Sequence, residues 1–181
     1  MVKSEIISWV RTLLLAVGFA LFINYFVIVN ASVPTGSMMD TIQENTRIVA
    51  LRFSYIFSEP KRLDVVVFKF PDNEKELYVK RIIGLPGETV EVTGGIVYID
   101  GEPLTEPYAV FKKEGRIPPD FGPYTVPEGQ YFMLGDNRNN SKDSRVWDHT
   151  CVERKKILGH VIFSYYTKGE GFFGIRFKGI K

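Results

Sequence analysis

The stretch Leu77–Val92, LYVKRIIGLPGETVEV, contains two strand-like segments and the turn that joins them. Leu77–Leu85 alternates well enough to be a strand. It stops where Pro86 presets φ and Gly87 can take the positive φ that a type II turn requires. TVEV then precedes IVYI across a Thr-Gly-Gly sequence, which is typical of a tight hairpin. This stretch therefore predicts antiparallel β-structure.

Short strand-like runs continue on both sides of this stretch, and no long amphipathic helix interrupts them. Proline-rich residues 103–127 form a looser segment, which we expect to be a surface excursion with little regular structure. The pattern predicts a mostly β, antiparallel fold. Further strands are expected at Arg47–Leu51, Asp64–Phe70, Gln130–Leu134 and Gly159–Tyr166.

The N-terminal part of the chain carries an apolar run, Leu13–Val29, of 17 residues without a charge. Extended by Ala31 and Val33, the run is long enough to cross ~30 Å of hydrocarbon as a helix. A cleaved signal peptide is the alternative, but the run is longer than the apolar region of most such peptides. We therefore expect an uncleaved anchor at residues 12–31.

Charges around the anchor predict its orientation. Lys3 and Arg11 precede the run, whereas Asp40 and Glu44 follow it. Because positive charge favours the cytoplasmic side, residues 1–11 are expected in the cytoplasm and residues 32–181 outside it. The expectation is a single-pass protein of the cell membrane.

The composition excludes some classes of protein. A chain of 181 residues can form one domain with a core, plus the anchor. The net charge is +2 and the basic residues are scattered, which argues against a nucleic-acid partner. The single cysteine excludes an internal disulfide.

The histidines and the cysteine are one candidate for a catalytic or metal-binding site. His149 lies two residues from Cys151, so a Cys-His pair or a metal site is conceivable, but the spacing matches no zinc motif. The other histidine, His160, lies in a strand-like run and is more typical of a packed residue.

Lys80 offers another candidate, as the partner of a serine. Burial against apolar groups lowers the pKa of a lysine, and the neutral amine can then act as a general base. Alternation places Lys80 on the face of Tyr78, with Arg81 on the other face. The alternative is a lysine that extends its charge into solvent.

Two small polar segments accompany this lysine. VPTGSMMDTI, Val33–Ile42, follows the anchor, and LGDNRNNSKDSRVWD, Leu134–Asp148, follows a predicted strand. The second segment has the composition of an ordinary polar loop. It can also supply a hydroxyl that orients a lysine and an ion pair that stiffens the loop.

Together these segments resemble the type I signal peptidases, in the compact single-anchor bacterial form. PTGSMMDT is similar to the family's serine box, and YVKRIIGLPGETVEV is similar to its lysine box. RLDVVVFKFP and GDNRNNSKDSR match the remaining segments, in the same order. The resemblance covers nearly the whole chain and implies a mostly β serine-lysine protease.

The resemblance also implies roles for single residues. Ser37 would be the nucleophile and Lys80 the general base and acid, with Ser141 orienting the amine. Thr35 and the Ser37 backbone N–H would form the oxyanion hole. The residues implied to support the site are Met38, Gly135, Asp136, Asn137 and the ion pair of Asp143 with Arg145.

The chain departs from the family pattern at three positions. Asp40 stands where proline is usual, which removes a rigid bend near the nucleophile. Asp148 stands where glycine is usual, and Thr35 where serine is commoner. Thr35 retains the hydroxyl that the oxyanion hole needs.

The function implied is cleavage of signal peptides from exported preproteins at the surface of the lipid bilayer, with no metal or organic cofactor. A soluble autoprotease of the LexA-repressor type conflicts with the apolar run. A processing peptidase with one dedicated exported substrate and a non-catalytic, membrane-anchored β binding module remain alternatives.

Overall fold

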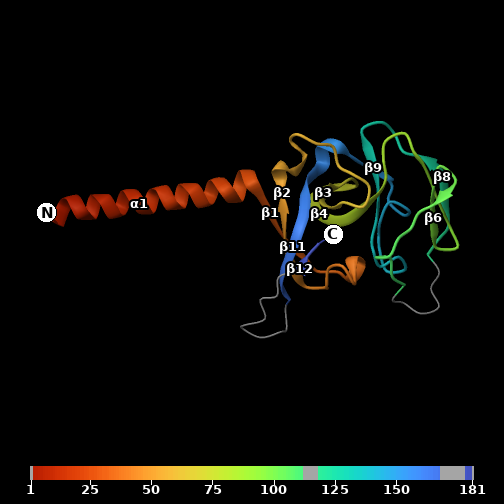
Figure 1. The fold of residues 1–181 in the computed structure, drawn as a ribbon, viewed down its shortest axis with the longest axis horizontal. Coiled ribbons are helices and arrows are strands. Elements are labelled where there is room, and N and C mark those ends of the chain that lie inside the picture. Colours follow the sequence, from red (N-terminus) through yellow and green to blue (C-terminus); the bar gives the residue numbers. More distant parts are fainter. Residues whose placement is uncertain (1, 112–117, 168–177, 181) are drawn as a thin grey trace.

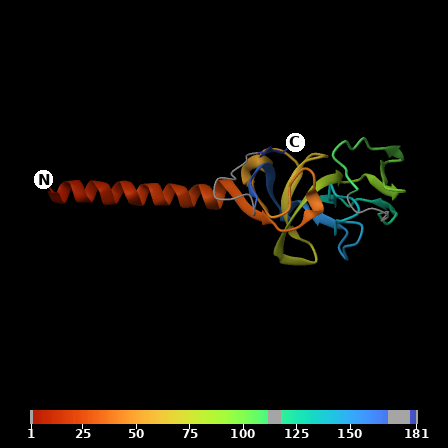
Figure 2. The same cartoon turned by 90° about the horizontal axis from the view of Figure 1, so that it is seen from below.

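The structure is a computed structural model that describes residues 2–111, 118–167 and 178–180. One N-terminal helix projects from a β domain (Figures 1 and 2). The fold is mostly β and antiparallel behind one apolar helix, as the sequence predicts. The elements are α1 (Val2–Phe22), β1 (Ile28–Val33), β2 (Thr46–Leu51), β3 (Val65–Phe70), β4 (Asn73–Gly84), β5 (Thr89–Thr93), β6 (Ile96–Ile99), β7 (Glu102–Pro103), β8 (Phe121–Thr125), β9 (Gln130–Leu134), β10 (Cys151–Glu153), β11 (Ile157–Thr167) and β12 (Lys178–Gly179).

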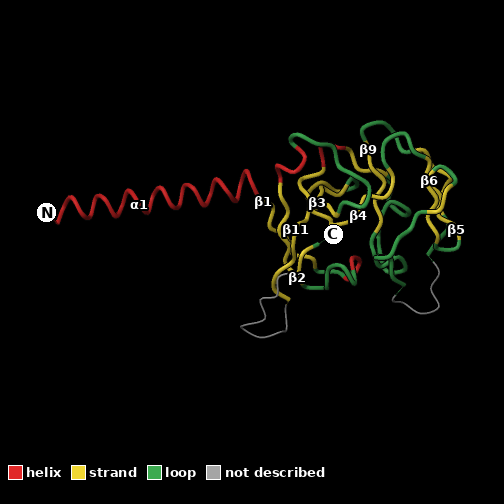
Figure 3. Tube along the Cα trace, in the orientation of Figure 1, coloured by secondary structure: helices red, strands yellow, loops and turns green. Residues whose placement is uncertain are grey.

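The strands form two antiparallel sheets (Figure 3). The larger sheet has the order β1-β2-β11-β3-β4-β9-β10, with β12 paired to β11, and the smaller has the order β7-β6-β5-β8. β4 joins β3 on one side, and only its last residues, from Arg81, pair with β9 on the other. Among the described residues, the first part of β4 therefore has one open edge, and so does β1.

The helical segment ends earlier than the sequence suggests. α1 continues into a π-helical turn, Ile23–Val27, and the span Glu5–Val27 has the length and apolar composition of a membrane-crossing helix. Instead of completing an anchor at residues 12–31, residues from Ile28 onward belong to β1. Pairing with β2 from Ile28↔Leu51 to Val33↔Thr46 explains the change, because it satisfies the backbone of this β-branched run.

The expected excursion at residues 103–127 is more regular than its prolines suggest. β8 lies inside it and pairs with β5, at the edge of the smaller sheet. An edge strand can contain Pro123, because one side of its backbone needs no partner strand. Residues 112–117 of the excursion lie outside the described residues.

One part of the core fixes the loop that follows β1. Met38 and Ile42 are completely buried and pack in the cluster formed by β1, β2, β3 and β11. Ile180, directly after β12, belongs to the same cluster. The turn that carries Ser37 is therefore held on the sheet by apolar side chains on both sides of it.

Candidate active site

Ser37 lies in a single 3-10 turn, Gly36–Met38, which is separated from the end of β1 by two residues. Its side chain is buried, and the turn is closed by hydrogen bonds from Ile42 N to Met38 O (2.8 Å) and from Asn45 N to Val33 O (2.8 Å). Met38, expected to help line the site, packs in the core below the turn. Backbone bonds and core packing thus hold the hydroxyl in one position.

Lys80 enters the site from β4. Its Nζ lies 2.8 Å from Ser37 Oγ and 3.2 Å from the carbonyl oxygen of Val79, and the side chain is only 4% exposed. Burial lowers the pKa of the Lys80 ammonium to about 8, although the charges of Asp143 and Asp136 oppose this shift. A substantial fraction of the amine is therefore neutral near pH 8, when it can accept the serine proton.

Thr35 places a second hydroxyl beside that of Ser37. Its Oγ1 lies 3.4 Å from Ser37 Oγ, and the residue has an extended backbone. Since β1 ends at Val33, two residues of extended chain separate the sheet from the turn. The Thr35 hydroxyl and the Ser37 N–H therefore belong to one short segment.

The loop after β9 packs against the turn that carries Ser37. Asn137 donates its backbone N–H to Ser37 O (3.0 Å) and its side-chain amide to Gly36 O (3.0 Å). A Cβ added to Gly135 would lie 2.3 Å from Ser141 Oγ and 2.6 Å from Ser37 O. Glycine is therefore required here for the two loops to approach so closely.

The end of this loop contains the expected ion pair and the buried hydroxyl of Ser141, which has no hydrogen-bond partner in the described chain. Arg145 binds Asp143 through two hydrogen bonds of 2.8 Å each, and Asp143 also accepts from Gly135 N (3.2 Å). Ser141 Oγ lies against Gly135 but has no hydrogen-bond partner within the described part of the chain. The expected contact of Ser141 with Lys80 is thus not made, and the amine bonds Val79 O instead.

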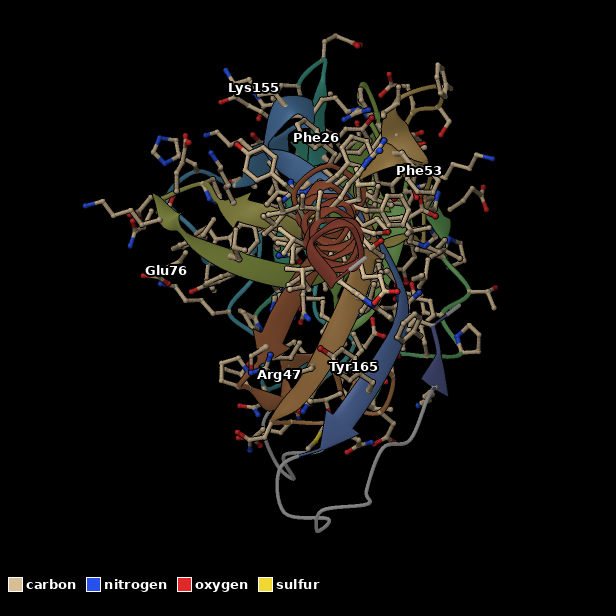
Figure 4. All side chains as sticks on the ribbon, turned by 90° about the vertical axis from the view of Figure 1, so that its left-hand side faces the viewer. Phe26, Arg47, Phe53, Glu76, Lys155 and Tyr165 are labelled. Carbon is tan, nitrogen blue, oxygen red and sulfur yellow. The ribbon has the colours of Figure 1, made fainter. Side chains whose placement is uncertain are left out.

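A groove of about 510 Å³ opens beside the Ser37–Lys80 pair. Its walls are Ser32–Thr35, at the end of β1, and Glu76–Val79, from the open-edged part of β4. Asn140 and Lys142 close one side. Viewed along α1, Glu76 lies at the outer end of β4, on the opposite side of the helix axis from Phe53 (Figure 4).

The model of one family, signal peptidase, peptidase S26, matches residues 6–166 of this chain. The chain belongs to the signal peptidase family. It is 40% identical to a signal peptidase I of Leptolyngbya laminosa over 90% of this chain and 81% of the relative. It is 41% identical to a signal peptidase I of Bacillus amyloliquefaciens over 93% and 92%. A crystal structure of a signal peptidase I from Enterococcus faecalis is 39% identical, covering 57% of this chain and 97% of that chain with a TM-score of 0.48.

In this member of the signal peptidase family, a buried ion pair connects three segments of the site. Arg81 binds Asp136 through Nε (2.9 Å) and Nη2 (2.7 Å), and both side chains are at most 2% exposed. Thr41, just after the nucleophile turn, donates its hydroxyl to Asp136. Asp136 was expected from the sequence as part of the site floor, but its partner Arg81 was not. The sequence did contain an indication of this pair. Arg81 is a second cation in an alternating strand, and a buried cation needs a carboxylate partner.

The excursion also contributes residues that the sequence did not indicate. Tyr108 lies over the Arg81 guanidinium, 3.9 Å from ring centre to Cζ, and Glu106 binds the buried Arg138. Val110 N donates to Asp136 O (2.8 Å), and Arg138 N donates to Val110 O (2.9 Å). No local pattern in this proline-rich segment indicates such contacts.

At the two aspartates that depart from the family pattern, backbone atoms make hydrogen bonds to neighbouring segments. Lys178, in β12, donates its ammonium to the Asp40 carbonyl oxygen (2.8 Å), so the C-terminal strand contacts the nucleophile loop. Asp148 N donates to Asp72 (3.1 Å) across the β3–β4 connection. Each aspartate is thereby connected to a neighbouring strand or turn.

The histidine and cysteine candidates lie away from the pair. The His149 side chain is 74% exposed and bonds Asp72 (2.9 Å), whereas Cys151 is buried in a core cluster. His160 packs against the Tyr55 ring, with the ring centres 6.1 Å apart. Their positions do not form a shared site with Ser37.

Proposed function

We propose that this protein is a membrane-anchored serine endopeptidase that cleaves signal peptides from exported preproteins with Ser37 and Lys80. The observation that carries the proposal is the 2.8 Å contact between Lys80 Nζ and Ser37 Oγ inside a buried site where the lysine pKa is lowered. The names of the relatives, signal peptidase I, support the substrate class.

The chemistry follows from these positions. Neutral Lys80 accepts the Ser37 proton as the hydroxyl attacks the peptide carbonyl, and the oxyanion is stabilised by the Thr35 hydroxyl and the Ser37 N–H. Lys80 then returns the proton to the leaving amine, and an acyl-enzyme remains on Ser37. Water activated by Lys80 releases the signal peptide. Ser141, in this proposal, bonds the amine when substrate repositions it.

The groove suits an extended peptide. It lies between residues of β1 and of β4 whose edges have no partner strand in the described chain, so a substrate strand can hydrogen-bond there. In an extended peptide the side chains one and three residues before the cut point the same way. Both can then enter the part of the groove lined by Val33, Pro34 and Val79, which favours small apolar side chains.

The N-terminal helix places this chemistry at the bilayer. We propose that α1 crosses the cell membrane once, with the N-terminus in the cytoplasm and the β domain outside. The exposed Phe53, Ile56 and Phe57 follow β2, whose end at Leu51 pairs with Ile28 at the helix end, and can contact lipid. A signal peptide that spans the same membrane emerges close to the Ser37 loop.

Cleavage by purified protein tests the proposal. The detergent-solubilised chain is incubated with a preprotein that carries an Ala-x-Ala site, beside a Ser37→Ala control, and the new N-terminus is sequenced. Cleavage after the second alanine by the native chain alone supports the proposal. Intact preprotein in both reactions would indicate a binding module, and cleavage elsewhere a peptidase with a dedicated substrate.

A further inference from the structure

A second cavity lies beyond the loop that closes the catalytic groove. It has a volume of about 350 Å³ and lies between Pro118–Pro119 and two segments of the loop, Arg138–Lys142 and Arg145–Val146. All of these residues are placed in the structure. No step of the mechanism above uses this cavity.

The second cavity shares part of its wall with the catalytic groove. Asn140 and Lys142 line both of them. Ser141, on the wall of the second cavity, lies against Gly135, and Gly135 in turn abuts the Ser37 carbonyl oxygen. A polypeptide that occupies the groove and continues past Ser37 therefore meets this loop and the cavity behind it.

The two cavities differ in chemistry. The groove is walled by apolar side chains such as Val33, Leu77 and Tyr78, whereas the second cavity presents amides, a hydroxyl and cations. Lys142 is exposed, and its ammonium lies 5.2 Å from the centre of the Phe70 ring. The salt bridges found in the described chain leave Lys142 unpaired.

Arg145 supplies an independent indication of a ligand. Its side chain is 2% exposed, and Nη1 has no hydrogen-bond partner among the residues placed in the structure, although Nε and Nη2 bind Asp143. An unsatisfied buried donor destabilises the site, and a carbonyl or carboxylate oxygen of a ligand would satisfy it. The donor belongs to a residue that lines the second cavity.

We propose that the second cavity binds the substrate segment that follows the scissile bond, and that Lys142 and Arg145 favour acidic residues in that segment. The proposal rests on the function proposed above. The open strand edges run along the groove and suit the residues before the cut, so the chain after the cut lies over the loop on the other side of Ser37. Its chemical class is a polar peptide with aspartate or glutamate two to four residues after the cut.

Crosslinking locates the segment without any need for cleavage. Full-length Ser37→Ala protein in detergent is mixed with an Ala-x-Ala peptide that carries a photo-crosslinker three residues after the cut site, and adducts are mapped by mass spectrometry. Adducts at Pro118–Pro119 or Asn139–Val146 are expected. A matched peptide with the crosslinker five residues before the site should react at Ser32–Pro34 or Glu76–Tyr78. Adducts of the first peptide at these groove residues, or no adducts from it, would overturn the proposal.

A charge reversal tests the preference. Peptides with Asp or Lys three residues after the cut are compared by kcat/KM, and the native chain should favour Asp by about threefold, as expected for a partly exposed pair. Lys142→Glu should reverse the order, whereas Lys155→Glu, at an exposed residue that lines neither cavity, should not. An unchanged order in Lys142→Glu contradicts the preference. Failure of the native chain to cleave any peptide would instead refute the proposed function, and the crosslinking result then decides this inference alone.

Discussion

Arg81 and Asp136 form a completely buried ion pair on the face of β4 opposite Lys80, and Thr41 joins it from the nucleophile loop. The three segments that carry the serine, the lysine and the loop after β9 therefore meet in one charged network. Tyr108 covers the guanidinium from the excursion. The network thereby connects the segments that hold Ser37 and Lys80.

Breaking this pair should destabilise the whole domain. Asp136→Asn is expected to lower the free energy of unfolding by ~3–5 kcal/mol, because it leaves a buried guanidinium without its counter-charge. Urea denaturation of the detergent-solubilised protein measures the change. Arg154→Lys, which alters a partly exposed pair with Glu59, should cost less than ~1 kcal/mol. Equal losses in the two variants would contradict the importance of the buried pair.

The pH profile of cleavage should show the titration of the Lys80 amine. Since only the neutral amine accepts the serine proton and its pKa is about 8, kcat/KM should rise about tenfold per pH unit at acidic pH. The rise should level off above an apparent pKa near 8. Initial rates with one peptide from pH 5.5 to 9.5 measure this. A rate that is flat or falls across this range would exclude Lys80 as the base.

Lys80 should also make the protein less stable when it is protonated. Below pH 8 the folded and unfolded states both hold the proton, so the cost of burying the ammonium is fully present. Between pH 8 and pH 10.5 only the unfolded state holds it, and stability rises with pH. Lys80→Met should therefore be more stable than the native chain at pH 7, by about 3 kcal/mol, and this advantage should shrink towards pH 10.5. Denaturation midpoints at both pH values test it, and an advantage that grows with pH would contradict the lowered pKa.

The Thr35 hydroxyl should matter for turnover and little for binding. Thr35→Ala is expected to lower kcat by ~10²–10³, as loss of an oxyanion donor does in other hydrolases, with nearly unchanged KM. Thr35→Ser keeps the hydroxyl and should retain most activity. Steady-state kinetics on one peptide separates the two parameters. A change confined to KM would assign Thr35 to substrate binding instead.

Gly135 should tolerate no side chain. In Gly135→Ala the new Cβ would meet the Ser37 carbonyl at 2.6 Å and Ser141 Oγ at 2.3 Å, so one of the two loops must move. We expect loss of most activity and a lower melting temperature. Gly179→Ala is the matched control, because nothing lies within 4 Å of its Cβ position. Native-like activity in Gly135→Ala would show that the loops are not in contact as described.

The sequence predicted the strands well because alternation and β-branched residues act locally. β2, β3, β4, β9 and β11 all lie where these patterns indicate. β8 was missed because Gly122 and Pro123 are typical of loops, and only the edge position in the smaller sheet makes a strand possible. The end of the helix was placed too late because an apolar run does not distinguish a helix in lipid from a strand in a core.

In the candidate site too, residues within local motifs could be predicted, whereas contacts between distant segments could not. Ser37 and Lys80 could be chosen by motif, and their 2.8 Å contact agrees with that choice. The pairing of Arg81 with Asp136 and the stacking of Tyr108 depend on contacts between distant segments, which local spacing does not encode. Ser141 was expected to bond Lys80, and in the structure its hydroxyl lies against Gly135 instead.

β1 has a consequence for where a substrate can be cut. Its six residues are paired one by one with β2, so the strand has a fixed length of ~20 Å between the end of the helical segment and the nucleophile turn. Under the proposed orientation, α1 and this paired strand together fix where Ser37 lies relative to the bilayer. A peptide bond is then cut only when its flanking residues suit the groove and it also lies at that position relative to the bilayer.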